Sequence, residues 1–412
     1  MHVLFLEPGF PKNQREFVRG LKSVGATITA IGEAPPDALD PELKGWLSGY
    51  ERVPSVTNGE AVLDAVKRVQ SRGWVDRLEA TVEAHIMPCA WVREQAQIPG
   101  TSQRTAFLCR DKPAMKDALR DAGVATAQSL GTSDADEARK FVEKVGYPVI
   151  VKPRDGAGAS GTFRANDADS LEHAIRESGL AQGHGVAVEE FIEGHEGIWD
   201  ALVVGGQVVH EFACHYYPGV LEAMRERWIS PQIVTTNRLD EPETYDEVKA
   251  MGRKVIEAIG IETSATHMEW FFGPKGLKFS EIGCRPPGVG MWDVYAAANE
   301  FDIYREWAHL IVHGKPEATP SRRYAGGMVA LRPNRDGRID YAKGVDEMHR
   351  KYGRHVIDVH IPAPGTPTQG VEAGYMANGW VRARHESIDA LRVVDASVAV
   401  RPERDGRIER SS

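Results

Sequence analysis

A lysine followed by a loop of small residues is the first pattern in this chain that could do chemistry. Lys152 ends a β-branched run, and the loop after it contains Gly156, Gly158, Ser160 and Gly161. Glycines let successive backbone N–H groups point into one hollow, which suits a polyphosphate. The lysine adds a compact positive charge. By itself such a segment is more often a plain turn, and the order of the features on either side of it favours a phosphate-binding loop.

Two glutamates far downstream form a second pattern. Strand-like runs at 267–272 and 277–282 flank the turn 273–276 and predict a β-hairpin that carries Glu269 and Glu281. Because side chains alternate along a strand, the two carboxylates can face each other on adjacent strands. Mg²⁺ takes one or two such carboxylates together with phosphates and water. The hairpin therefore predicts a metal site, with an ordinary salt bridge as the alternative for Glu269.

The same alternation assigns the neighbours of these glutamates. It places His267 and Phe271 on the face of Glu269, and Phe279 on the face of Glu281. His267 is interpreted as a structural histidine, with a substrate contact as the alternative.

The elements that must position these residues begin with a βαβ pattern. A strand at 3–6, a helix at 14–24 and a strand at 26–31 predict a Rossmann-like unit over residues 1–110. Its first turn, 7–11, contains two prolines and no G-x-G-x-x-G pattern. Prolines lack the N–H groups that a pyrophosphate needs, so the turn argues against a nicotinamide cofactor.

Two further units and a tail follow. Helices at 111–123, 134–145 and 169–178 alternate with strands at 148–152, 161–165 and 186–192, which predicts a small α+β unit over 111–192. A larger mixed unit covers 193–401, with expected strands at 199–204, 207–214, 267–272, 277–282 and 326–332. Residues 402–412 are polar and are expected to fray.

Composition limits the class of protein. The net charge of −9 gives no reason to expect nucleic acid as a partner. Four widely separated cysteines are typical of reduced thiols, and no apolar run approaches the ~20 residues of a membrane span. We expect a cytoplasmic protein with small-molecule partners, no membrane partner, and a homodimer as the default assembly.

Taken in order, these motifs resemble the ATP-grasp superfamily, specifically its carboxylate–amine ligase and biotin-carboxylase-like branch. The resemblance covers roughly residues 1–400 and implies a Rossmann-like pre-ATP-grasp domain followed by an ATP-grasp fold with a small lid subdomain and a large subdomain. It also implies ATP as a cofactor, with one or two Mg²⁺ ions, for which Mn²⁺ is an alternative.

The resemblance assigns roles to individual residues. Lys112 and Lys152 would bind the ATP phosphates under a lid loop at 156–161. Glu281 and Glu269 would hold the metal, and Arg285 would steady the transferred phosphate or the acyl-phosphate. The adenosine would lie against the segment 189–196: Glu189 and the backbone of Glu190, Phe191 and Ile192 would hold adenine, and Glu196 would bond the ribose.

Two departures from the family pattern concern the metal site and bicarbonate. Where the family usually has an asparagine ligand after the second glutamate, this chain has Gly283. Arg285 is followed by Pro-Pro-Gly-Val-Gly, without the acid or amide that biotin carboxylases carry there. Arg332 matches an arginine that faces the substrate in that branch, and its planar fork suits a carboxylate anchor.

The sequence thus predicts an ATP-dependent carboxylate–amine ligase that forms an amide through an acyl-phosphate and releases ADP and phosphate. Amino acids or similar small acids are the expected substrates. Two alternatives stay open: a bicarbonate-using carboxylase and a nucleotide-binding module without catalysis.

Overall fold

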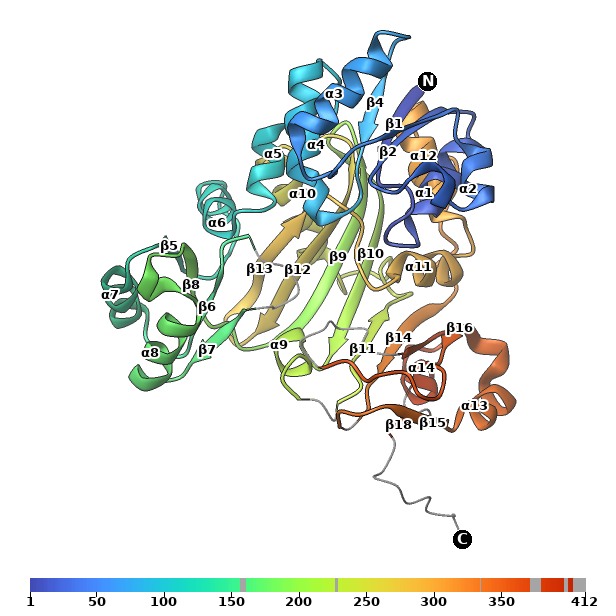
Figure 1. Cartoon of the computed structure of the whole chain (residues 1–412). Helices are drawn as coiled ribbons and strands as arrows, with labels where there is room; N and C mark the ends of the chain where they lie inside the picture. The colour runs from blue at the N-terminus through green and yellow to red at the C-terminus, as the bar shows by residue number, and fades with distance from the viewer. Residues whose placement is uncertain (156–160, 227–228, 334, 371–378, 396–398, 403–412) are drawn as a thin grey trace.

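The computed structural model describes residues 1–155, 161–226, 229–333, 335–370, 379–395 and 399–402 (Figure 1). Within them the chain forms a mixed α/β structure. A parallel sheet comes first, a small antiparallel sheet follows, and a large antiparallel sheet forms the centre of the molecule.

The N-terminal unit is a parallel sheet in the order β3-β2-β1-β4. Its strands are β1 (His2–Leu6), β2 (Thr27–Gly32), β3 (Gly49–Arg52) and β4 (Arg77–Glu79). The βαβ opening predicted from the sequence is present. The helices of this unit are α1 (Gln14–Ser23), α2 (Pro41–Trp46), α3 (Gly59–Gln70), α4 (Glu83–Ala96) and α5 (Gln103–Leu108), with a short 3₁₀ helix at Pro36–Ala38.

A small antiparallel sheet, in the order β5-β8-β6-β7, projects to one side of the molecule (Figure 1). Its strands are β5 (Ser129–Thr132), β6 (Val149–Pro153), β7 (Phe163–Ala165) and β8 (Val186–Glu190). The associated helices are α6 (Lys112–Asp121), α7 (Ala135–Val145) and α8 (Ala168–Glu177), with a 3₁₀ turn at Leu180–Gln182. The apolar residues of α7, α8 and this sheet form a core of their own, from Ala138 to Val188.

The large sheet has the order β13-β12-β9-β10-β11-β14-β17-β16. Its strands are β9 (His195–Val204), β10 (Gln207–Tyr217), β11 (Gln232–Thr235), β12 (Ser264–Gly273), β13 (Gly276–Gly283), β14 (Ala325–Leu331), β16 (Val356–His360) and β17 (Gly379–His385). The helices are α9 (Val220–Ala223), α10 (Asp246–Ile259), α11 (Met291–Asn299), α12 (Ile303–His313), α13 (Val345–Tyr352) and α14 (Ile388–Asp395), with a 3₁₀ turn at Gly353–His355. A separate two-stranded ribbon pairs β15 (Ile339–Lys343) with β18 (Ala399–Pro402).

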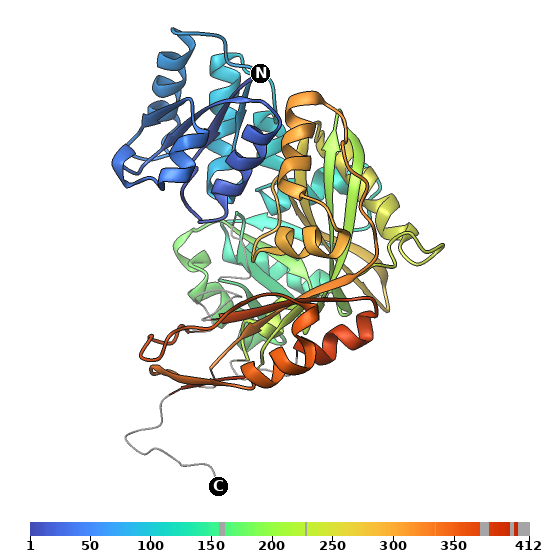
Figure 2. The same ribbon diagram turned by 90° about the vertical axis from the view of Figure 1, so that its right-hand side faces the viewer.

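Helices cover both faces of the central strands of this sheet. On one face α10 approaches β9 so closely that a methyl group on Gly252 would overlap the buried ring of Trp199. On the other face α11 and α12 lie between the sheet and α1 of the N-terminal unit (Figures 1 and 2). There Phe17 lies 5.0 Å from Trp292 and 5.1 Å from Trp307, between ring centroids.

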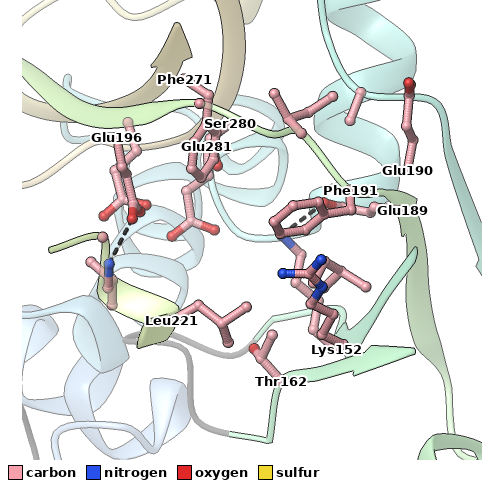
Figure 3. Close-up of a pocket in the computed structure, with 18 of the residues that line it drawn as sticks. Lys152, Thr162, Glu189, Glu190, Phe191, Glu196, Leu221, Phe271, Ser280 and Glu281 are labelled. Atoms are coloured by element: carbon pink, nitrogen blue, oxygen red, sulfur yellow. Dashed lines mark hydrogen bonds and ion pairs between the residues drawn. The ribbon is translucent and has the colours of Figure 1, made fainter. Parts of the chain in front are cut away.

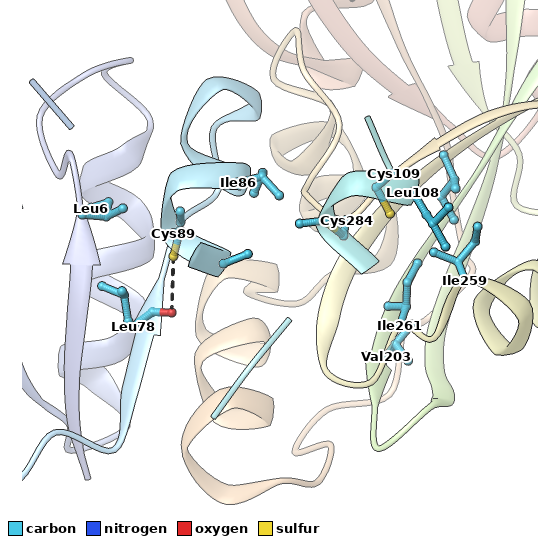
Figure 4. Packing of buried hydrophobic residues seen from close by; sticks show 14 of the residues in the cluster. Leu6, Leu78, Ile86, Cys89, Leu108, Cys109, Val203, Ile259, Ile261 and Cys284 are labelled. Carbon is cyan, nitrogen blue, oxygen red and sulfur yellow. Dashed lines mark hydrogen bonds between the residues drawn. The ribbon is translucent and has the colours of Figure 1, made fainter. Parts of the chain in front are cut away.

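The N-terminal sheet therefore shares its core with the large sheet. One hydrophobic cluster joins Leu6 and Leu78 of the parallel sheet to Val203 of β9 and Ile259 of α10 (Figure 4). The four cysteines are buried and free, as the sequence predicts. Among the described helices, none is both long enough and apolar enough to cross a membrane.

Candidate active site

A cavity of about 510 Å³ lies between the small sheet, the β12–β13 hairpin and α9. Figure 3 shows charged side chains from both sheets that line it. Nine of the predicted site residues line this cavity: Lys112, Lys152, Glu189, Glu190, Phe191, Ile192, Glu196, Glu269 and Glu281. Lys112 and Glu281, which are 169 positions apart in the chain, thus line the same cavity.

The two hairpin carboxylates face each other as predicted. Glu269 is the direct cross-strand partner of Glu281, and the Nζ atom of Lys112 lies 3.5 Å from a carboxylate oxygen of Glu281. The predicted strict alternation is wrong at one place, because the register shifts next to Glu269 and leaves Ser280 as an extra residue. Phe279 consequently pairs with Trp270 and packs in the same core cluster.

A network of buried polar side chains contacts the carboxylate of Glu269. Its carboxylate accepts a hydrogen bond from the Tyr216 hydroxyl at 3.2 Å and lies 3.6 Å from Nε2 of His267. The other ring nitrogen of His267 lies 2.8 Å from Asp200, which accepts a 2.5 Å hydrogen bond from the Tyr295 hydroxyl. Burial opposes the charged imidazolium, but Asp200 outweighs it and raises the pKa of His267 to about 9. His267 is therefore a partnered histidine, as its structural interpretation predicted.

Glu196 adds a third carboxylate to this corner. Burial, and then the charge of Glu269, raise the pKa of Glu196 to about 8, although its side chain accepts a 2.6 Å hydrogen bond from the backbone N–H of Val220. Negative charge is thus crowded where Glu196, Glu269 and Glu281 meet, and a cation would relieve this repulsion. In the described ranges no three His, Cys, Asp or Glu side chains form a metal cage. A metal here would use Glu269 and Glu281 together with substrate oxygens and water, which is how Mg²⁺ is commonly bound.

A second charged cluster lies beside the hinge, which is the segment 190–195 that links β8 of the small sheet to β9 of the large sheet. The carboxylate of Glu189 is 2.6 Å from the Nζ atom of Lys116 and 2.9 Å from that of Lys152. Although burial favours the neutral acid, the two lysines lower the pKa of Glu189 to about 2. The predicted adenine contact of the Glu189 side chain stays a prediction, because its oxygens face the lysines.

Sequence reasoning missed Lys116. The signal was its position four residues after Lys112, since residues that far apart on a helix share one face. Lys116 is only 1% exposed, so its charge is directed inward.

The remaining hinge and loop residues are placed as follows. The guanidinium of Arg164 lies 4.1 Å from the ring centroid of Phe191, and Lys275 of the hairpin turn forms an ion pair with Glu190. Gly161, two residues before β7, has a left-handed backbone (φ 66°). The predicted phosphate contacts Gly156, Gly158 and Ser160 lie outside the described residues.

The structure does not bring the two predicted arginines into the lining of this cavity. Arg285 donates to Glu83 at the start of α4, whose carboxylate also accepts from Arg110 at 2.7 Å. The arginine therefore joins the hairpin to the N-terminal unit. Arg332 is buried behind α9, where it donates to the carbonyl of Ala223, so its guanidinium supports a wall of the cavity. Carboxylate anchoring by Arg332 and phosphate contact by Arg285 stay predictions.

Comparison with known proteins gives a domain family and similar folds. Residues 117–301 match the ATP-grasp domain model. The chain is 24% identical over 323 residues to an L-arginine-specific L-amino acid ligase of Bacillus subtilis, which covers 77% of this chain and 76% of the relative.

Solved structures share the fold over nearly the whole chain. An L-amino acid ligase from Bacillus licheniformis has a TM-score of 0.76 at 18% identity and covers 98% of this chain and 99% of its own. The biotin carboxylase domain of the Hydrogenobacter thermophilus 2-oxoglutarate carboxylase, in complex with MgADP, ADP and bicarbonate, has a TM-score of 0.68 at 19% identity. It covers 97% of this chain and 90% of its own.

Proposed function

We propose that this chain, a member of the ATP-grasp superfamily, is a ligase. It joins the carboxyl group of an amino acid or similar small acid to an amine. A carboxylate oxygen attacks the γ-phosphorus of ATP, which gives an acyl-phosphate and ADP. The amine nitrogen then attacks the carbonyl carbon, the amide forms, and phosphate leaves with the bonding electrons while the amine loses a proton. Activation is needed because a carboxylate in water has no adequate leaving group.

The observation that carries this proposal is the composition of one cavity. Lysines from α6 and β6 and carboxylates from the β12–β13 hairpin border the same space. Phosphoryl transfer asks the protein mainly for positioning and charge neutralisation, and these side chains are suited to both. Lys112 and Lys152 would bind the phosphates, and Glu269 with Glu281 would hold Mg²⁺, which supplies charge stabilisation to the transferred phosphate. The small sheet, with its separate core, would close over the nucleotide and keep water from the acyl-phosphate.

The first test is release of ADP and phosphate from ATP and Mg²⁺ in the presence of pools of amino acids and small acids, with and without bicarbonate. The proposal expects release that requires one acid and one amine, with an amide detected by mass spectrometry. Release driven by bicarbonate alone would make the protein a carboxylase. ATP binding without turnover under every pool would contradict catalysis.

Glu281→Gln tests the assignment of the metal site. The substitution removes one negative charge and keeps the shape, so turnover should fall at least about a hundredfold, as for loss of an essential electrostatic contact. Glu257→Gln on the exposed face of α10 is the matched control and should retain wild-type turnover. Full activity of the Glu281 variant would remove this residue from the site.

A further inference from the structure

Two lysines share a single carboxylate at the wall of the cavity. Lys116 from α6 and Lys152 from β6 both contact Glu189 on β8, at 2.6 and 2.9 Å. A buried carboxylate needs only one cation for neutrality. Two cations and one anion leave one positive charge in a place where water is largely excluded.

Burial of the Lys116 ammonium group costs free energy of folding. Lys116 is 1% exposed, and burial lowers its pKa to about 8 despite the nearby charge of Glu189. The neighbouring Lys152 adds repulsion between the two ammonium groups. A merely structural helix position would be filled at lower cost by an apolar residue, because α6 already buries Met115 and Leu119.

The position of the cluster indicates what the excess charge serves. Lys116, Lys152 and Glu189 all border the cavity, whereas the carboxylates of Glu269 and Glu281 line its opposite corner. Without Lys116, Glu189 would neutralise Lys152, and this pair would carry no net charge. With Lys116 present, Lys152 keeps a charge that an anionic ligand can use.

We propose that Lys116 is a positioning residue, which neutralises Glu189 and so leaves the charge of Lys152 available to the phosphates of the nucleotide. The inference rests on the proposed binding of ATP in this cavity, and it adds a residue that need not touch the ligand itself. It also assigns the Glu189 side chain to charge balance within the wall.

Three variants that change the net charge of the Lys116–Lys152–Glu189 cluster test the proposal. The wild-type cluster has a net charge of +1, Lys116→Met has 0, Glu189→Gln has +2, and the double variant returns to +1. The dissociation constants of ADP with MgCl₂, and of adenosine, are measured for each by titration calorimetry. Adenosine lacks phosphates, so its affinity reports on the folding of the pocket and on adenine contacts alone.

The proposal expects ADP affinity to follow the net charge. Lys116→Met should weaken ADP binding about tenfold, Glu189→Gln should strengthen it, and the double variant should bind within a few-fold of wild type. Adenosine affinity should be the same in Lys116→Met as in the wild type, and the same in the double variant as in Glu189→Gln. If Lys116→Met fails to fold, the gain in ADP affinity of Glu189→Gln over wild type still decides the matter.

Three results would overturn the inference. ADP affinity that is unchanged in Lys116→Met, a double variant no better than Lys116→Met, or equal losses of ADP and adenosine would each show that Lys116 does not act through Lys152. Failure of the proposed function looks different, because the wild-type protein would then bind neither ADP nor ATP.

Discussion

At the scale of single residues, the site consists of charges that constrain one another. Four carboxylates of the cavity, those of Glu189, Glu196, Glu269 and Glu281, and its three lysines each have at least one partner of opposite charge or a hydrogen-bond donor. Substitutions here should therefore be compared in pairs, because removing one charge changes the state of its neighbours.

The lowered pKa of Lys116 predicts a pH dependence of nucleotide binding. Its ammonium faces Glu189 on β8, Lys152 on β6 and, farther away, Glu281 on β13. Glu189 has a pKa of about 2 and the pKa of Lys152 is raised, so Lys116 is the member of its cluster that titrates near pH 8. Between pH 7 and 9, ADP affinity should fall severalfold more in the wild type than in Lys116→Arg, whose guanidinium remains charged, while the titration of Glu196 near pH 8 contributes equally to both proteins. A parallel fall in both proteins would contradict this.

The titration of Lys116 also predicts how the free energy of unfolding changes with pH. The folded protein holds the Lys116 proton less tightly than the unfolded chain, whose lysine has the ordinary pKa of 10.5. The contribution of Lys116 to the free energy of unfolding therefore rises with pH between about 8 and 10.5, and Lys116→Arg should lack this rise. Urea unfolding at pH 7.5 and 9.5 measures it.

Much of the site could be predicted from the sequence, because strand alternation and short turns leave few possible positions for charged residues at strand ends and in hairpins. The pairing of Glu269 with Glu281 followed from strand alternation and one turn. The surroundings of Arg285 and Arg332 could not be predicted, because their partners Glu83 and Ala223 are fixed by tertiary packing across more than a hundred residues. The bulge at Ser280 likewise depends on both strands of the hairpin and leaves no signal in either.

At the scale of elements, the site depends on how closely α10 approaches the large sheet. Gly252 faces the ring of Trp199, whose indole N–H donates to Glu211 at 3.0 Å. β9, which carries Trp199, also carries Glu196 and Asp200 toward the site, so α10 supports those side chains from behind. This contact is visible only in the structure, since a glycine inside a helix pattern suggests little by itself.

Gly252→Ala should be destabilising, because the added methyl group overlaps the Trp199 ring. We expect a loss of about 1–3 kcal/mol in the free energy of unfolding, as for other overpacked cores. Gly45→Ala is the matched control: Gly45 lies within α2 and a methyl group there meets nothing within 4 Å. The control should be neutral or more stable by about 0.5–1 kcal/mol. Thermal unfolding compares the two, and equal effects would contradict the packing argument.

At the scale of the whole molecule, the cores divide the chain unequally. The N-terminal sheet is continuous with the large sheet through two hydrophobic clusters and through the Arg19–Asp302 ion pair, at 2.8 Å. The small sheet has a separate cluster. The sequence predicted three units from its alternating elements, but the sharing of a core between the first and the third depends on side chains of α1, α11 and α12 that only the fold brings together.

The separate core of the small sheet predicts where nucleotide will change hydrogen exchange. Amides of β6 and β7 should exchange faster than those of β1 and β2 in the free protein, because a small cluster opens more easily than a shared one. ADP with Mg²⁺ at 100 times its dissociation constant should slow the exchange of β6 and β7 up to about a hundredfold and leave β1 and β2 unchanged. Uniform protection over the whole chain would show instead that the molecule opens as one unit.

The same division of cores has a consequence for recombining this protein with its relatives. A segment that encloses its own apolar side chains can be transplanted between distant sequences, because its interior travels with it. The small sheet with α7 and α8 meets this condition. A crossover point near residue 110 would instead separate Phe17 from Trp292 and Trp307. The aromatic rings of one parent protein would then have to pack against those of the other in the shared core. Chimaeras that aim at new substrates should therefore exchange the small sheet with α7 and α8 but without α6, or the N-terminal unit together with α11 and α12.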